Sequence, residues 1–86
     1  MTSTDRGYRD IIRAIIEAQE LVIGPLARDI AKKVPNLQYS PSKEVLGKLV
    51  SEYGLVFGQA SIEVCKDAIK PLLSKFGNID LPQNLL

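Results

Sequence analysis

Apolar positions recur at spacings of three and four residues along most of the chain, the pattern of helices with one buried face. The first apolar stripe runs from Tyr8 to Ile23 and is interrupted at Gly24–Pro25. Proline is tolerated in the first turn of a helix, so we expect a second helix to begin at Pro25. It should end just before Pro35, because the residue before a proline is driven out of helical geometry. The first half therefore predicts a helical hairpin.

The second half shows the same pattern. A third helix should open at Ser40–Pro41 or at Ser42, and a fourth should run to about Phe76. Gly58 lies where a break equivalent to the one at Gly24 would fall. Because no proline follows Gly58, we expect this break to be softer, even to the point of a continuous helix.

The two halves correspond at one constant offset, without a gap: Leu21–Lys32 returns as Leu55–Lys66, and Arg9–Ile12 returns as Lys43–Leu46. Most of the agreement is of residue class, and such a period is typical of a duplicated helical hairpin. We therefore predict an all-α fold, a small four-helix bundle built from two duplicated hairpins. Residues 1–86 form a single domain with halves at about 5–38 and 39–76. The tail, 77–86, should pack in extended form across a groove or be partly disordered.

Composition narrows the classes of protein. The chain has 11 basic and 10 acidic residues, a formal charge of +1, so it lacks the basic field of a typical nucleic-acid-binding protein. One cysteine fits a reducing compartment. The N-terminus lacks the apolar core of a signal peptide, and no uncharged run is long enough for a membrane span. We expect a soluble, cytoplasmic protein that does not enter a membrane.

Catalytic chemistry has few candidates. Histidine is absent, which removes the commonest general base and the commonest transition-metal ligand. Cys65 lies on an apolar helix face and is interpreted as a small core residue. Glu17 and Glu20 are one turn apart, but an exposed helix face explains them more simply than an acid–base pair. We predict no enzyme activity, no cofactor and no metal.

The segment from Leu26 to Val56 resembles the second and third helices of winged-helix transcriptional regulators. This resemblance implies nucleic-acid contacts on the first of those helices and at the start of the next, at Arg28, Lys32, Lys33 and Lys43. The would-be recognition helix carries two lysines and two glutamates that cancel, and it has no Arg, Asn or Gln to read base edges. In that family a two-stranded wing follows the position of Val56, where this chain predicts a helix. We expect weak nucleic-acid binding and keep a DNA-binding regulator as the alternative function.

The motif Ile23-Gly24-Pro25-Leu26-Ala27 resembles the "IGPIA" motif of an uncharacterised helical domain appended to prokaryotic signalling proteins. In that domain the motif starts a helix, and another leucine-rich helix follows, as Val45–Val50 does here. The resemblance implies a non-catalytic role in signalling.

The predicted function is therefore a helical module for protein–protein interaction. Residues 21–23 and 55–57 are runs of three apolar residues, and such a run spans about 200° of a helix, more than one neighbouring helix covers. A second copy of the chain is the simplest cover, so we predict a homodimer, with another protein as a further partner. The predicted interface consists of Leu55, Phe57, Leu81, Leu85 and Leu86.

Overall fold

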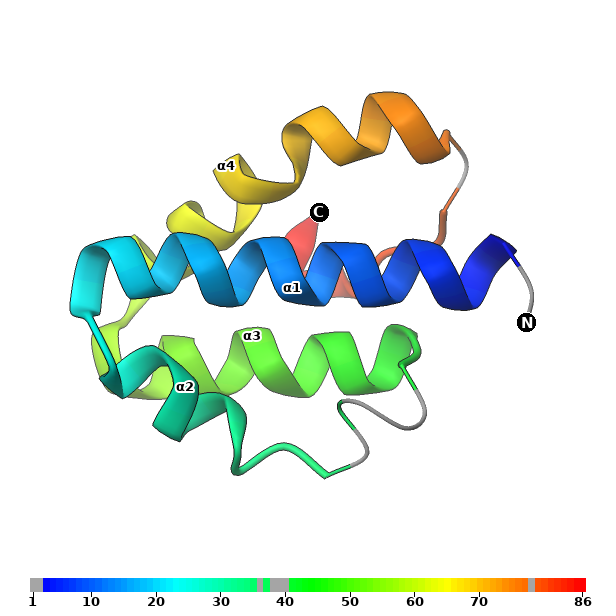
Figure 1. Ribbon diagram of the computed structural model, residues 1–86. Coiled ribbons are helices and arrows are strands. Elements are labelled where there is room, and N and C mark those ends of the chain that lie inside the picture. Colours follow the sequence, from blue (N-terminus) through cyan, green and yellow to red (C-terminus); the bar gives the residue numbers. More distant parts are fainter. Residues whose placement is uncertain (1–2, 36, 38–40, 78) are drawn as a thin grey trace.

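The computed structural model describes residues 3–35, 37, 41–77 and 79–86, with side chains from Arg6 onward. Within these residues the chain forms α1 (Ser3–Ile23), α2 (Leu26–Ala31), α3 (Lys43–Phe57), α4 (Gln59–Phe76) and a short 3-10 helix, η1 (Gln83–Leu85) (Figure 1). The predicted all-α fold is confirmed, and the described residues contain no strand. The predicted boundary between the halves, at 38 and 39, and the possible helix start at Ser40 lie outside the described residues.

The first hinge forms at Gly24, which has a φ of 69° and so adopts a backbone conformation that favours glycine. Its N–H donates to the carbonyl of Glu20 at 2.9 Å and closes the last turn of α1. The following helix, α2, is shorter than the predicted helix that ended just before Pro35. After Ala31 the backbone hydrogen bonds change from the α-helical to the 3-10 pattern. The Lys33 N–H donates to the carbonyl of Ile30, three residues back, at 3.1 Å. A tightened last turn satisfies carbonyls at a helix end and stops the helix early.

The second hinge is sharper than the sequence predicts. Ser42 opens α3, because its hydroxyl accepts the N–H of Val45 at 3.2 Å. At the other end, a single residue, Gly58, separates α3 from α4. Its φ of 74° and ψ of −157° lie in a region that is essentially reserved for glycine. The helix is therefore broken without a proline, and Gly24 and Gly58 are hinges at equivalent positions of the two halves.

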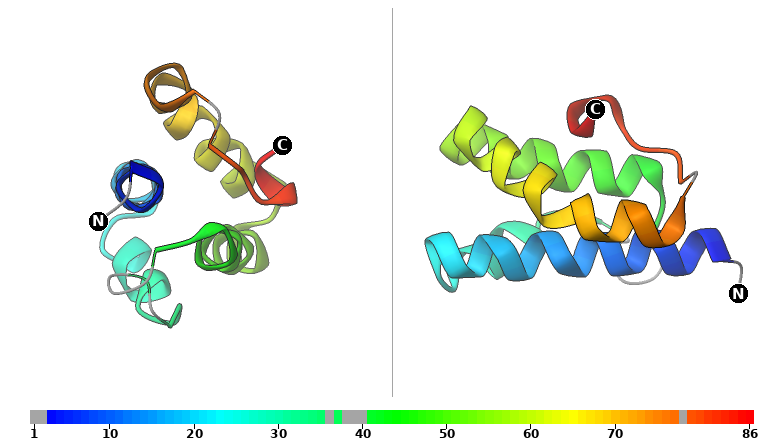
Figure 2. Two further views of the ribbon diagram at one scale, coloured as in Figure 1. Left: turned by 90° about the vertical axis from the view of Figure 1, so that its right-hand side faces the viewer. Right: turned by 90° about the horizontal axis from the view of Figure 1, so that it is seen from above.

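Viewed end-on, the four helices follow one another around the bundle in chain order (Figure 2). Each helix packs against the next, and α1 also packs against α4. The long first helix of each half thus contacts the second helix of the other half. The core residues line the space that the helices enclose; they are Tyr8, Ile11, Ile12, Ile15, Ala27, Ile30, Ala31, Val34, Val45, Leu46, Leu49, Val50, Tyr53, Cys65, Ile69 and Leu85.

Two buried hydrogen bonds join the halves in a reciprocal manner. On one side, Gln19 Nε2 of α1 donates to the carbonyl of Ser61 in α4 at 2.9 Å. On the other, the Tyr53 hydroxyl of α3 donates to the carbonyl of Ala27 in α2 at 2.7 Å. Gln19 and Tyr53 are equivalent positions of the two halves, and so are Ala27 and Ser61. Such reciprocal bonds are what two halves related by an approximate two-fold axis would make.

The tail after α4 packs against the bundle in its described part, residues 79–86, the first of the two predicted alternatives. It runs beside α3 and α4, as the end-on view in Figure 2 shows. Leu85 is 5% exposed and joins the core. The carbonyl of Asp80 accepts the Tyr8 hydroxyl at 2.6 Å and ties the tail to α1.

Candidate functional site

Large apolar side chains are exposed where the hinges lie. The exposed fractions are 90% for Leu21 and 63% for Val22 on α1, 45% for Leu26 on α2, and 81%, 48% and 39% for Leu55, Val56 and Phe57 on α3. The C-terminal ends of α1 and α3 lie at the same end of the bundle in Figure 1 and in the right-hand view of Figure 2. We call these six residues the hinge-end surface.

The sequence produces this surface in a simple way. A run of three apolar residues wraps around more than half of a helix, so one neighbouring helix covers only part of it. In the first run, Ile23 is half-buried against the core while Leu21 and Val22 face outward. Leu26 is the first residue of α2, beside the hinge, and is also exposed. In the second run, Leu55 and Val56 are the equivalents of Leu21 and Val22, and Phe57 is exposed where its equivalent Ile23 is half-buried.

The structure separates the predicted interface residues into two groups. Leu55 and Phe57 belong to the hinge-end surface. Leu81, Leu85 and Leu86 lie in the tail, whose Asn84 contacts the middle of α3 at Gly47. Of these three, Leu85 is buried, Leu81 is half-buried and Leu86 is 77% exposed. Leu21, Val22 and Leu26 were not among the predicted interface residues, although the correspondence with Leu55 and Val56 was a signal for the first two.

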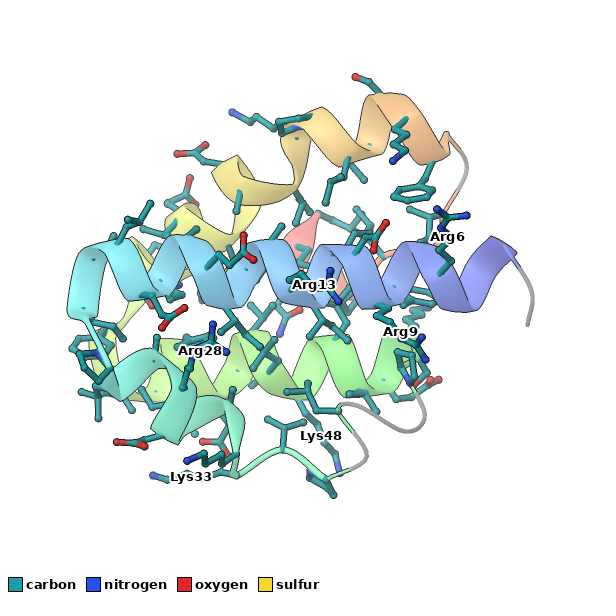
Figure 3. All side chains as sticks on the ribbon, in the orientation of Figure 1. Arg6, Arg9, Arg13, Arg28, Lys33 and Lys48 are labelled. Carbon is teal, nitrogen blue, oxygen red and sulfur yellow. The ribbon has the colours of Figure 1, made fainter. Side chains whose placement is uncertain are left out.

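The basic residues predicted as alternative nucleic-acid contacts lie on two elements: α2 with the turn after it, and the start of α3. Arg28 Nε binds the carboxylate of Glu20 at 2.8 Å, and this hydrogen bond raises the pKa of Arg28. Lys43 Nζ pairs with the Asp80 carboxylate at 3.2 Å on a different helix. Lys32 and Lys33 are exposed in the turn after α2, and Figure 3 shows Lys33 there. Residues 56–63, where a wing would begin, are the end of α3 and the first turn of α4.

The residues considered for catalytic chemistry, Cys65, Glu17 and Glu20, have different surroundings in the described part of the chain. Cys65 is fully buried, and burial raises the pKa of its thiol, which disfavours the reactive thiolate. Glu20 is engaged in an ion pair by Arg28, and Glu17 lines a groove among arginine side chains. Among the described residues, no three His, Cys, Asp or Glu side chains lie close enough together to hold a metal ion.

A second feature of the surface was not anticipated from the sequence. A groove of about 310 Å³ lies between α1 and α2 and is lined by the charged side chains of Arg9, Arg13, Glu17 and Arg28. Its apolar lining includes Ile12 and Ile16 from α1. Figure 3 shows Arg9 and Arg13 along α1 and Arg28 rising from α2 toward α1. We call this the arginine groove. Its signal in the sequence was the pair Arg9 and Arg13, four residues apart on one helix face.

Comparison with protein-family models, with curated proteins and with solved structures gave no match. Across the described residues, none of the helices combines the length and the hydropathy that crossing a lipid bilayer requires.

Proposed function

We propose that this chain is a non-catalytic helical module for protein–protein interaction that associates with a second copy of itself through the hinge-end surface. The observation that carries the proposal is the exposure of six large apolar side chains at one end of a small bundle. Large exposed apolar side chains gathered in one region of a protein often mark an interaction surface. The motif that resembles the signalling-protein domain lies at this same hinge and supports a regulatory role.

A second copy suits this surface for two reasons. The same Leu-Val pair occurs twice, as Leu21-Val22 and Leu55-Val56, so four of the six residues form two equivalent pairs. In a two-fold symmetric dimer each patch meets its own copy, and two equivalent pairs allow Leu21 of one chain to face Leu55 of the other. The formal charge of +1 opposes association only weakly.

DNA binding receives less support from the geometry. Two of its four candidate contacts, Arg28 and Lys43, are held in ion pairs that DNA phosphates would have to break. Phosphate contacts supply most non-specific affinity for DNA, so few uncompensated cations mean weak binding.

The test is the molar mass in solution, measured by light scattering over a concentration series from low to high micromolar. We expect the wild-type chain to show the mass of a dimer at the high end. The double variant Leu21→Asp/Leu55→Asp should be monomeric, because an interface core disfavours charged groups. Both positions are exposed in the single chain, so this variant should fold normally by circular dichroism.

Leu86→Asp is the matched control, because Leu86 is also a highly exposed leucine but lies in the tail. It should leave the dimer intact. A wild-type chain that stays monomeric at high micromolar concentration would refute self-association. A dimer that Leu86→Asp dissociates, and that Leu21→Asp/Leu55→Asp does not, would move the interface to the tail.

A further inference from the structure

In the second half of the chain, the tail covers the outer face of α3. Three kinds of contact hold it against α3. Lys43 pairs with Asp80 at 3.2 Å, and Asn84 Nδ2 donates to the carbonyl of Gly47 at 3.0 Å and to Ser51 Oγ at 3.2 Å. Pro82 approaches Gly47 so closely that a Cβ at position 47 would lie 3.2 Å from Pro82 Cβ. A segment with one acidic side chain thus lies along this face, and it ends in the 3-10 helix η1.

The arginine groove is the counterpart of that face in the first half. At the offset that relates the two halves, positions 43, 47 and 51 correspond to Arg9, Arg13 and Glu17, all of which line the arginine groove. The end-on view of Figure 2 shows the tail outside α3 and α4, on the side of the bundle opposite to the outer face of α1 and α2. No helix or tail of the described chain fills the arginine groove, which stays open at about 310 Å³.

The differences between the two grooves indicate what the open one would accept. Lys43, which pairs with an aspartate of the tail, corresponds to another cation, Arg9. Gly47, which makes room for Pro82, corresponds to Arg13, an exposed residue that forms no ion pair within the described chain. Arg28 also lines the groove but is paired with Glu20, so the groove offers a ligand mainly Arg9 and Arg13, with the carboxylate of Glu17 and apolar side chains beside them. Guanidinium groups bind carboxylates with two parallel hydrogen bonds.

We propose that the arginine groove binds an extended, acidic segment of another protein, with one carboxylate at Arg9, a second at Arg13 and apolar side chains between them. The segment would lie along α1 as the tail lies along α3. This site is separate from the hinge-end surface, so the inference does not depend on self-association.

The experiment uses the full chain and a fluorescently labelled peptide, IDLDQNLL. This is the tail sequence from Ile79 to Leu86 with aspartate in the place of Pro82, so that its second carboxylate can meet Arg13. The control peptide, INLNQNLL, replaces both aspartates with asparagine. Fluorescence anisotropy at low ionic strength should show micromolar binding of the acidic peptide and much weaker binding of the neutral one.

Variants of the protein locate the peptide. Arg13→Gln should weaken binding about threefold, and Arg9→Gln/Arg13→Gln about tenfold, because exposed ion pairs contribute up to about 1 kcal/mol each. Lys48→Gln removes the same charge from the exposed side of α3 and should change nothing. Peptide binding should persist in the monomeric variant Leu21→Asp/Leu55→Asp, which separates this site from the proposed dimer.

Three results would overturn the proposal. The first is equal affinity for the acidic and neutral peptides. The second is weaker binding in Lys43→Gln but not in Arg13→Gln, which would place the peptide in the tail's own groove. The third is a single-stranded oligonucleotide that displaces the peptide and binds more tightly than it, which would make the groove a nucleic-acid contact.

Discussion

Gln19 of α1 and Tyr53 of α3 occupy equivalent positions, and each reaches across the core to the other half of the chain. Tyr53 does so with a hydroxyl group and Gln19 with an amide. The Tyr53 hydroxyl donates at 2.7 Å to a carbonyl of α2. The Gln19 amide donates at 2.9 Å to a carbonyl of α4 and lies 3.3 Å from the sulfur of Cys65. However, Gln19 Oε1 has no hydrogen-bond partner among the described residues. Equivalent positions of the two halves thus carry a hydrogen-bond donor that reaches the other half, but the chemistry of the two side chains differs.

The two outer grooves differ at one pair of equivalent positions. Gly47 lets the tail lie directly on α3, whereas Arg13 occupies the corresponding space on α1 with a long, charged side chain. The second half therefore covers its outer face with its own chain, and the first half presents a charged groove. Each of the following experiments changes one member of such an equivalent pair.

The largest expected effect is a loss of stability in alkaline solution that depends on Tyr53. Burial is the main reason that the pKa of Tyr53 is raised from 10.0 to about 12. Below pH 10 both the folded and the unfolded chain keep the proton, so this residue adds no pH dependence. Between pH 10 and 12 only the unfolded chain loses it, which favours unfolding. The free energy of unfolding should fall by about 3 kcal/mol over this range, at about 1.4 kcal/mol per pKa unit.

Urea unfolding followed by circular dichroism, from about pH 9 to about pH 12, measures this loss. Burial also raises the pKa values of Tyr8 and Cys65, so the wild-type chain loses stability for those reasons as well. Tyr53→Phe isolates the part due to Tyr53, because its profile should be flatter by about 3 kcal/mol. Parallel profiles for the two chains would show that Tyr53 is not buried as a neutral phenol.

The general fold could be predicted from the sequence because helical periodicity and an internal repeat are properties of many residues together. The hinge at Gly58 was underestimated because the sequence shows only a glycine, while its φ and ψ depend on the packing of both helices. The hydrogen bonds of Gln19 and Tyr53 were not predicted, because the pattern along one helix does not reveal a side chain's partner on another helix. Their signal was a long polar side chain at the same position of both halves, facing the small residues Ala27 and Ser61.

The candidate surfaces were predictable to a lesser degree. Leu55 and Phe57 could be proposed from a run of apolar residues, because no single neighbour covers such a run. The burial of Leu85 depends on where the tail docks, which local pattern does not determine. The arginine groove combines residues of α1 with Arg28 of α2, and their proximity follows only from the hinge between the helices.

The second-largest expected effect concerns Gly47, whose equivalent in the arginine groove is Arg13. Gly47→Arg places in the second half the residue that the first half has at position 13. Its side chain should expel the tail, because even a Cβ at this position lies 3.2 Å from Pro82. Exposing Leu85 costs about 2 kcal/mol, and losing the contacts of Asn84 costs about 1 kcal/mol more, while removing glycine from a helix returns about 1 kcal/mol. We expect a net loss of about 2 kcal/mol in the free energy of unfolding.

Gly47→Ala is the control for this substitution. It gains the same helix propensity and adds only the Cβ, so its stability should stay within about 1 kcal/mol of wild type. Limited proteolysis gives a second readout: a protease that cleaves after leucine should remove the tail of the Gly47→Arg chain faster than that of Gly47→Ala. Equal cleavage rates would mean that the tail tolerates an arginine at this position and that Gly47 does not determine which groove is covered.

The smallest expected change in the free energy of unfolding concerns the hydrogen bond of Gln19 across the core. Gln19→Met keeps the length of an unbranched side chain and removes the amide. The hydrogen bond to Ser61 is lost, but so is a buried oxygen without a partner, and replacing both kinds of polar atom by an apolar group of similar shape is often nearly neutral. The Ser61 carbonyl keeps its bond within α4. We therefore expect the free energy of unfolding to change by less than about 1 kcal/mol.

Tyr53→Phe at neutral pH is the matched substitution, because Tyr53 is the equivalent of Gln19 in the second half of the chain. It removes a hydroxyl that has its partner, the Ala27 carbonyl, and leaves no compensating gain. We expect a loss of about 1.5 kcal/mol, larger than for Gln19→Met. Chemical denaturation of both variants in one buffer gives the difference directly. If Gln19→Met costs as much as Tyr53→Phe, the free oxygen of Gln19 imposes no penalty, and the two crossings stabilise the bundle equally.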